Sequence, residues 1–249
     1  MMKDIIIGYG IVGNNLHKEL YRLNCEVCDK YKKIFPPKEK YRIAFICVPT
    51  ELKEDNTLDT SEVENAINEN DAEIYVIKST VPVCFTEELV KNTNKRIIFS
   101  PEYYGNTQHC NNYNFDFTIL GGKKEDCIFV QNVLQEVYDG RHKFIYTDSK
   151  TAELCKFMEN SWLAYKVTFC IEFFKICEQY GISYEELREL FILDERVNPS
   201  HTFVYRDHPY FDSHCLNKDV PHIANQSNSE LLKEIIKINN KNKEKYKNG

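Results

Sequence analysis

Short apolar runs alternate with segments of helical spacing through the first part of the chain. The apolar runs include "DIIIG", "CEVCD", "RIAFICV", "EIYVIKS" and "RIIFS". Segments such as "SEVENAINEN" and "TEELVKN" separate them, and their apolar residues recur three and four positions apart. This alternation is typical of a parallel sheet with helices on both faces. We therefore predict a doubly wound α/β domain for residues 1–148.

The pattern changes near residue 148. Residues 149–180 form one apolar-periodic run without Pro or Gly, "SKTAELCKFMENSWLAYKVTFCIEFFKICEQY". Its length predicts a central helix, and its wide apolar face predicts burial by more than one neighbour. We expect residues 149–249 to form an all-helical second domain around this helix, and we expect the helix to mediate a homodimer.

A glycine-rich turn follows the first apolar run. In "GYGIVG", Gly8, Gly10 and Gly13 have the G-x-G-x-x-G spacing between a predicted strand and a predicted helix. Such a turn lets the backbone approach a pyrophosphate, and the helix N-terminus offers free N–H groups. Asp29 ends the next strand, about twenty residues on, where a carboxylate accepts ribose hydroxyls. A Rossmann-type domain that binds NAD rather than NADP is the favoured interpretation; a glycine turn without a ligand is the alternative.

Composition and charge exclude several classes of protein. The 249 residues are 42% apolar and 28% charged, with a formal net charge of -6, which argues against a nucleic-acid-binding protein. No stretch approaches the roughly 18 apolar residues that a membrane span needs. The N-terminus has no basic leader, and the ten cysteines are interpreted as reduced thiols, so a cytoplasmic protein without membrane contact is expected.

Cysteine and histidine spacing does not predict a metal site. Cys25 and Cys28 form a single C-x-x-C without a second pair, which leaves a tetrahedral zinc set incomplete. Four histidines match no common ligand spacing: His201, His208, His214 and His222. We expect core thiols, surface imidazoles and no metal.

Two polar pairs in the second domain are candidates for chemistry. Lys156 and Asn160 lie four apart in the long helical run, and Cys215 and Asp219 lie four apart in "HCLNKDV", with Lys218 between them. On a helix each pair would share a face. One such pair is commonly a surface stripe, but its repetition in one domain favours a reactive site.

Two further candidates follow strands of the first domain. Thr80 in "KSTVP" and Glu102 in "FSPE" each come directly after a predicted strand. The ligands of doubly wound sheets bind at the carboxyl ends of the strands. Thr80 and Glu102 are therefore expected at the edge of the sheet where chemistry takes place.

At this point the chain resembles the nucleotide-sugar 6-dehydrogenases, which include the UDP-glucose and GDP-mannose enzymes. The matching segments span nearly the whole chain in the family's order: "GYGIVG", "CVPT", "KSTVPV", "SPE", "AELCKFMENSWLAYKVTF", "LDERV" and "HCLNKDV". The resemblance implies an NAD-dependent oxidoreductase of polysaccharide biosynthesis. It would oxidise the C6 hydroxyl of a nucleotide sugar, UDP-glucose before others, to the uronic acid in two steps.

The resemblance also implies roles for single residues. Cys215 would be the nucleophile that forms a thiohemiacetal and then a thioester, with a pKa depressed by Lys218 and a helix N-terminus. Lys156 and Asn160 would donate to the oxyanion, Asp219 and Thr80 would hold the reactive water, and Glu102 would act as acid and base. The implied substrate-binding residues are Glu102, Lys156, Asn160, Arg196 and Lys218, with Arg196 reaching across a subunit interface. The implied cofactor-binding residues are Gly8, Gly10, Ile11, Val12, Gly13, Asp29, Val48, Pro49, Thr50 and Thr80.

The chain departs from the family pattern at several points. We expect a short form without the family's C-terminal domain. "RDHPYFDSHC" replaces the family's glycine-rich approach to the cysteine, Cys84 stands where glycine is usual, and Asn106 stands where a second glutamate is usual. Two alternatives therefore stay open. One is a one-step dehydrogenase of a smaller hydroxy-acid or sugar-acid substrate, and the other is a truncated, non-catalytic subunit that pairs with a full-length homologue.

Overall fold

The computed structural model of the chain describes residues 2–104 and 115–247, so Asn106 lies outside the described residues. The chain divides into two compact units. The first comprises Met1–Lys53 and Leu58–Lys156, and the second comprises Glu54–Thr57 and Phe157–Gly249. The long helix α5 begins at Ser149 in the first unit and continues into the second.

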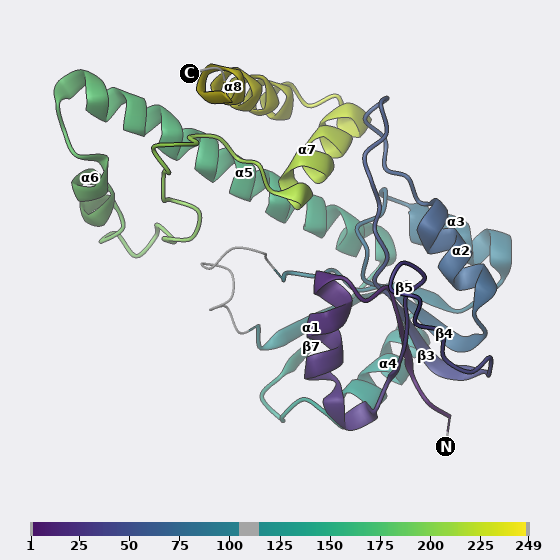
Figure 1. The fold of residues 1–249 in the computed structure, drawn as a ribbon. Helices are drawn as coiled ribbons and strands as arrows, with labels where there is room; N and C mark the ends of the chain where they lie inside the picture. The colour runs from purple at the N-terminus through teal and green to yellow at the C-terminus, as the bar shows by residue number, and fades with distance from the viewer. Residues whose placement is uncertain (1, 105–114, 248–249) are drawn as a thin grey trace. The chain divides into compact units, whose positions relative to one another are not determined.

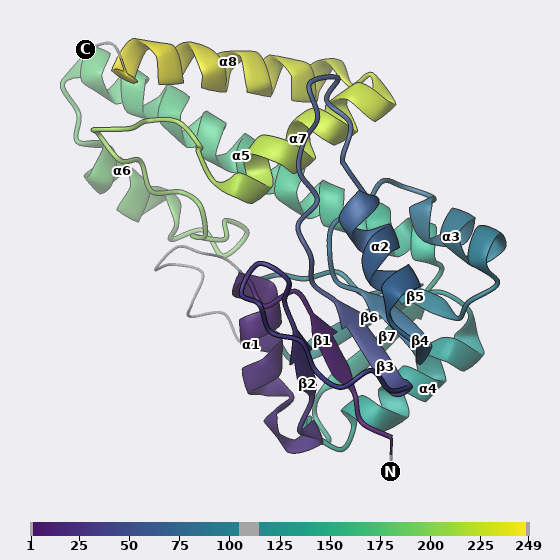
Figure 2. The same cartoon turned by 45° about the vertical axis from the view of Figure 1, so that its right-hand side comes forward.

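A sheet of seven described strands forms the centre of the first unit, in the order β2-β1-β3-β4-β5-β6-β7 (Figure 1, Figure 2). The strands are β1 Ile5–Ile7, β2 Glu26–Cys28, β3 Tyr41–Ile46, β4 Ala72–Ile77, β5 Ile97–Phe99, β6 Phe117–Gly121 and β7 Lys143–Thr147. The first five pair in parallel, and β6 pairs with β7 in parallel. At Phe99↔Gly121, however, β5 meets β6 antiparallel. The predicted doubly wound fold is confirmed, with its last two strands reversed.

Helices cover both faces of this sheet. The helices α1 (Ile11–Glu19) and α4 (Lys124–Leu134) pack on one face. The other face holds α2 (Ser61–Glu69), α3 (Phe85–Thr93) and the start of α5. Successive side chains of a strand point to opposite faces, so Ile5 and Ile7 lie in one core and Ile6 in the other. A strand buried on both faces must be apolar at every position, which explains the uninterrupted runs in the sequence. A short 3₁₀ helix, Tyr21–Leu23, follows α1.

The second unit is helical. Its helices are the continuation of α5 (Ser149–Tyr180), α6 (Tyr184–Phe191), α7 (His214–Ser227) and α8 (Glu230–Lys247). One apolar cluster joins α5, α7 and α8, and a second joins α5 and α6. The chain turns between α5 and α6 at Gly181, which has φ +66°. Pro221 lies inside α7.

The cysteines of the described residues are not joined in disulfides. Cys25 is buried and Cys28 is half-buried, and burial raises the pKa of Cys25 to about 12. A thiol with such a pKa stays protonated at neutral pH, as expected for a core residue rather than a metal ligand. Among the described helices, none combines the length and the apolar character that a membrane crossing needs.

Cys84 has a backbone conformation that favours glycine. It precedes α3 with φ 78°, in the left-handed region. The family's usual glycine at this position thus corresponds to a real conformational requirement that the chain meets with a cysteine. For a residue with a Cβ, this conformation costs about 1–2 kcal/mol.

Replacing Cys84 with glycine should stabilise the protein relative to replacing it with alanine. Both variants lose the thiol, but only Cys84→Gly removes the strain. Since glycine loses about 0.5–1 kcal/mol more backbone entropy on folding, we expect Cys84→Gly to exceed Cys84→Ala by about 0.5–1 kcal/mol in unfolding free energy. Urea denaturation measures the difference. Equal midpoints for the two variants would show that the turn is not strained.

Candidate active site

The three glycines of the turn after β1 meet different requirements. Gly8 has φ +90°, and a Cβ there would lie 2.5 Å from the carbonyl oxygen of Cys47. A Cβ at Gly13 would lie 1.9 Å from the carbonyl oxygen of Gly8. At Gly10, no described atom lies within 4 Å of an added Cβ. Gly8 and Gly13 are therefore required by the protein's own packing, whereas Gly10 leaves open backbone at the start of α1, where a pyrophosphate binds.

Asp29 is fixed at the end of β2 by backbone donors. The N–H of Tyr9 donates to Oδ2 at 2.7 Å, and the N–H of Lys32 donates to Oδ1 at 2.8 Å. Burial tends to raise the pKa of Asp29, but the N–H donors of Lys32 and Tyr9 outweigh it and hold the pKa below its ordinary value. The carboxylate is therefore ionised beside the glycine turn, as an acceptor of ribose hydroxyls must be.

An open depression of about 400 Å³ lies beside this turn. It is lined by Gly10, Ile11, Asn14, Asn15 and Lys32. The bare backbone of Gly10, the N-terminus of α1 and the ionised Asp29 together fit a dinucleotide such as NAD. Lys32 adds one cation to the wall, and its Nζ donates to the carbonyl oxygen of Tyr9 at 2.6 Å.

The segments that follow β3 and β4 are tied to each other. The hydroxyl of Ser79 donates to the carbonyl oxygen of Val48 at 2.6 Å, and the hydroxyl of Thr50 donates to that of Thr80 at 2.7 Å. Thr50 and Ser79 are buried. Val48, Thr50 and Thr80 are thus brought together at the carboxyl edge of the sheet, the edge at which the sequence predicted Thr80.

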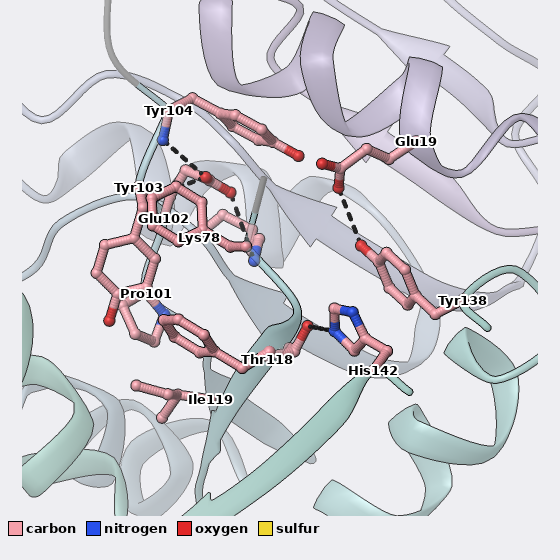
Figure 3. Close-up of a pocket in the computed structure, with 12 residues that line it drawn as sticks. Glu19, Lys78, Pro101, Glu102, Tyr103, Tyr104, Thr118, Ile119, Tyr138 and His142 are labelled. Atoms are coloured by element: carbon pink, nitrogen blue, oxygen red, sulfur yellow. Dashed lines mark hydrogen bonds and ion pairs between the residues drawn. The ribbon is translucent and has the colours of Figure 1, made fainter. Parts of the chain in front are cut away.

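Glu102 follows β5 and is held by two backbone donors and one ion pair (Figure 3). Its Oε1 accepts the N–H groups of Tyr103 at 2.6 Å and Tyr104 at 3.0 Å. The Nζ of Lys78 lies 3.6 Å from Oε2. Burial raises the pKa of Glu102 and outweighs the opposing effects of Lys78 and the two N–H groups. A carboxyl group with a raised pKa is suited to accept a proton near neutral pH.

The cavity beside Glu102 is small, about 50 Å³, which is room for a few water molecules rather than a sugar. Figure 3 shows Glu19 beside Tyr138, whose hydroxyl donates to Oε2 of Glu19 at 2.9 Å. Thr118 Oγ1 lies 2.8 Å from Nε2 of His142. The wall of this cavity thus combines hydrogen-bonded polar groups with apolar side chains such as Phe115, Phe117 and Ile119.

Lys156 is buried on α5, and its Nζ lies 4.9 Å from the ring centroid of Tyr103. The backbone N–H of the same tyrosine donates to Glu102. Tyr103, which the sequence did not single out, therefore links two of the predicted site residues of the first unit.

In the second unit, Asn160, Lys218 and Asp219 form a buried cluster. Nδ2 of Asn160 donates to Oδ2 of Asp219 at 2.6 Å, and Nζ of Lys218 lies 2.5 Å from Oδ1. Asp219 is 1% exposed, so its charge depends on these partners. Three of the predicted residues are thus in direct contact.

Cys215 is the second residue of α7 and is exposed. Ser213 caps this helix, because its side chain accepts the N–H of Leu216 at 3.2 Å. The dipole of a helix favours negative charge near its first turn. Lys218 and Asp219 lie one turn further along the same helix.

The segment before Cys215 is fixed by α8 rather than by glycines. Asn239 accepts the N–H of Phe211 at 2.8 Å and donates to the carbonyl oxygen of Phe211 at 3.0 Å. Two arginines of the second unit, Arg196 and Arg206, pair with neighbouring acids. Arg196, whose side chain is 88% exposed, pairs with Asp194, and Arg206 pairs with Glu185.

One histidine prediction is wrong. His222 is 3% exposed rather than a surface imidazole, and its ring centroid lies 5.3 Å from that of Phe157. It faces inward because its position on α7 follows Asp219 by three residues, on the buried side of the helix. Burial lowers its pKa, against the opposing effects of the Asn56 backbone and Asp219. Within residues 2–104 and 115–247, no group of three or more His, Cys, Asp or Glu side chains could hold a metal ion.

Sequence reasoning missed Lys78, Tyr103 and Asn239. Lys78 and Tyr103 immediately adjoin the segments that carry Thr80 and Glu102, so their positions gave a usable signal. Asn239 lies 28 residues from Phe211 in the chain, and no local pattern marks it.

Two family models match the chain. The NAD binding domain of the UDP-glucose/GDP-mannose dehydrogenase family matches residues 22–142, and the central domain of that family matches residues 150–241. The chain belongs to this family. NAD is therefore its cofactor, in agreement with the glycine turn and Asp29.

Similar proteins include dehydrogenases that are named for two different nucleotide sugars. UDP-glucose 6-dehydrogenase of Rickettsia felis is 28% identical over 78% of this chain and 47% of its own length. UDP-N-acetyl-D-mannosamine dehydrogenase of Methanocaldococcus jannaschii is 26% identical over 83% of this chain and 50% of its own length. The chain thus spans about half the length of these curated relatives.

Solved structures show the same fold. A UDP-glucose dehydrogenase from Pyrobaculum islandicum superposes with a TM-score of 0.79 at 19% identity, over 96% of this chain and 68% of that one. A 3-hydroxyisobutyrate dehydrogenase from Mycobacterium tuberculosis superposes with a TM-score of 0.71 at 14% identity, over 97% of this chain and 93% of that one.

Alanine at Gly10 and at Gly13 should separate cofactor binding from folding. A Cβ at Gly13 collides with the Gly8 backbone, so Gly13→Ala should lower the melting temperature of the free protein. Gly10→Ala adds its methyl group to open space, so it should leave that temperature unchanged yet weaken NAD binding at least about tenfold, since the backbone no longer reaches the pyrophosphate. Thermal unfolding and calorimetric titration with NAD measure both effects. Unweakened NAD binding by Gly10→Ala would place the cofactor elsewhere.

Proposed function

We propose that this chain is an NAD-dependent nucleotide-sugar 6-dehydrogenase that oxidises the C6 hydroxyl of a nucleotide sugar to the uronic acid, with UDP-glucose as the first candidate. Residues 1–148 would bind NAD, and residues 149–249 would supply the catalytic and dimerisation helices. The observation that carries the proposal is the arrangement on α7, where Cys215 begins the helix and the next turn holds Asp219 bound to Asn160 and Lys218. Family membership supports it.

The cofactor would bind at the turn after β1. Gly8, Gly10, Gly13 and Asp29 would hold it, together with the segments at Val48–Thr50 and Thr80. When bound, NAD supplies the chemistry of hydride acceptance, once for each of the two oxidations.

Cys215 would supply the covalent step. After the first oxidation, its thiolate adds to the C6 aldehyde; a C–S bond forms, and the carbonyl electron pair moves onto oxygen. Lys156 and Asn160 would donate to that oxygen. An amide NH₂ has two hydrogens, so Asn160 can donate one to Asp219 and the other to the oxyanion.

Water would release the product. After the second oxidation the sugar is held as a thioester, and water attacks its carbonyl carbon; a C–O bond forms, the C–S bond breaks, and the thiolate leaves. Thr80 and Asp219 would hold this water. Glu102 would accept its proton, a role that its raised pKa supports.

The nucleotide diphosphate needs cations. We propose Arg196, from the partner subunit, and Lys218 for this role. Both side chains have an acidic partner within the chain, Asp194 and Asp219, so a bound diphosphate would share or displace these pairs. Described cysteines that are not joined in disulfides support a reducing, cytoplasmic location.

A one-step dehydrogenase of a smaller hydroxy acid is the second candidate. The fold is compatible with it, because a 3-hydroxyisobutyrate dehydrogenase superposes over 97% of this chain with a TM-score of 0.71. A one-step enzyme needs no nucleophilic cysteine, so the two candidates differ in their dependence on Cys215.

The number of NADH molecules formed per product should decide between them. We expect two NADH per uronic acid with UDP-glucose or UDP-N-acetylmannosamine, and we expect Cys215→Ala to lower kcat by at least about a thousandfold, since the thioester route is closed. Cys155→Ala, which removes another exposed thiol, is the matched control and should retain full activity. NADH formation that survives Cys215→Ala unchanged would refute the two-step proposal. A chain without turnover that assembles with a longer homologue would be a non-catalytic subunit.

We also propose a homodimer through α5. Seven apolar side chains, three and four positions apart, form an aromatic stripe on this helix: Met158, Trp162, Tyr165, Phe169, Phe173, Ile176 and Tyr180. Trp162 is 56% exposed and Tyr180 is 76% exposed. Successive rings from Trp162 to Phe173 lie 4.8–6.0 Å apart. A continuous apolar surface of this kind marks an association site, and a second copy would cover it by the same stripe.

A charge within the aromatic stripe should separate the subunits. Trp162→Glu would bury a carboxylate at the centre of the contact, so we expect the dissociation constant of the dimer to rise at least about a hundredfold. Sedimentation equilibrium measures this dissociation constant. Leu231→Glu changes an apolar side chain of similar exposure, 62%, on α8 and should leave the mass unchanged. A monomeric wild-type protein at micromolar concentration would contradict the proposal.

A further inference from the structure

Glu153 is a buried carboxylate that has no part in the chemistry above. It lies on α5 and is 0% exposed. Its Oε2 accepts the N–H of Cys84 at 2.7 Å, and its Oε1 accepts the N–H of Thr86 at 2.9 Å. One side chain of α5 therefore binds both of these backbone donors at the start of α3.

This cap is unusual because it comes from another helix. A helix start is ordinarily capped by the Ser, Thr, Asp or Asn that precedes it. Within the described chain, the side chain of Cys84 makes no such bond. Taking a carboxylate out of water is unfavourable, and burial raises the pKa of Glu153 even though Thr86 and Cys84 oppose the shift. A cap from a neighbouring Ser, Thr, Asp or Asn would avoid this desolvation penalty. Capping of α3 alone therefore does not account for the burial of Glu153.

The contact fixes the segment that carries Thr80. Only three residues lie between Thr80 and Cys84. At the other end of the segment, Thr50 binds the carbonyl oxygen of Thr80 and Ser79 binds that of Val48. Thr80 is therefore held between two anchors, one on the segment after β3 and one on α5.

Glu153 also lies close to Lys156 on the same helix. Residues three apart share a helix face, so the carboxylate that holds the Thr80 segment is on the same side of α5 as the ammonium group of Lys156. Two of the three proposed catalytic groups of the first unit, Thr80 and Lys156, are thereby linked through one buried side chain.

We infer that Glu153 is a positioning residue, which fixes Thr80 relative to Lys156 so that the water of the hydrolytic step is held at the thioester. This inference rests on the proposed function, because it takes from there the role of Thr80. The loss of Glu153 should then affect the release of the product from Cys215 more than the binding of NAD.

The test compares Glu153→Gln with Glu87→Gln. Glutamine has the shape of glutamate, but its NH₂ group faces one of the two N–H donors. Glu87 is the matched control, since it carries the same charge in the first turn of α3 with a side chain 41% exposed. Hydrogen exchange at the Cys84 and Thr86 amides should become about tenfold faster or more in Glu153→Gln, the effect of losing a charge-assisted bond. Glu87→Gln should leave it unchanged.

Kinetics supply the functional measurement. For Glu153→Gln we expect kcat to fall about tenfold or more, Kd for NAD to change less than about twofold, and an acyl adduct on Cys215 to accumulate in intact-mass spectra. Glu153→Asp, which keeps the charge but has a shorter reach, should restore part of the rate, and it serves as the test variant if Glu153→Gln does not fold.

Two outcomes would overturn the inference. Unchanged exchange at Cys84 and Thr86 would show that no clamp exists. Faster exchange with parallel losses in melting temperature and NAD binding, and without an adduct, would show a purely structural role. If the wild-type protein forms one NADH per product, the proposed function fails, and with it the role of Thr80, while the exchange measurement still reports the clamp itself.

Discussion

A carboxylate removed from water must find N–H donors or cations, and this requirement organises the molecule. Asp29, Glu153 and Asp219 are all buried. Asp29 binds the backbone on either side of the cofactor depression, Glu153 binds the start of α3, and Asp219 binds Asn160 and Lys218. Each acid joins segments that are distant in the chain, and losing its partners would leave a buried charge uncompensated. The hydrogen bonds and ion pairs of these three carboxylates therefore fix the positions of the segments that they join.

The parts of the fold predicted from sequence are those that depend on local periodicity. The runs of β1, β3 and β4 are apolar at successive positions because both faces are covered, and α5 is continuous because it contains neither Pro nor Gly. Gly8, Gly13 and Asp29 were recognisable since their requirements are steric or electrostatic and nearly local. The reversed direction of β6 and β7 could not be predicted, because side-chain alternation is the same for a strand in either direction.

In the candidate site, sequence spacing predicted which residues share a helix face but not which residues bond to each other across the fold. Spacing placed Cys215 with Asp219, and Lys156 with Asn160, on common helix faces. The bond from Asn160 to Asp219 joins residues 59 apart, and that from Glu153 to Cys84 joins residues 69 apart. No helical or strand period extends over such separations, so Asn239 and Glu153 gained their roles through tertiary contacts alone. The burial of His222 was missed for the same reason.

Pro221 lies in the middle of α7, and the helix continues past it. A proline has no N–H, so the carbonyl of Asn217, four residues earlier, loses its usual partner, and the helix is weakened there. The part of α7 beyond Pro221 is held from outside the helix, because Nδ2 of Asn225 donates to the carbonyl oxygen of Asp55 at 3.1 Å. The part before Pro221, which carries Cys215 and Asp219, is held by the bond from Asn160 to Asp219. The position of the exposed thiol therefore depends on side-chain contacts as well as on the backbone of α7.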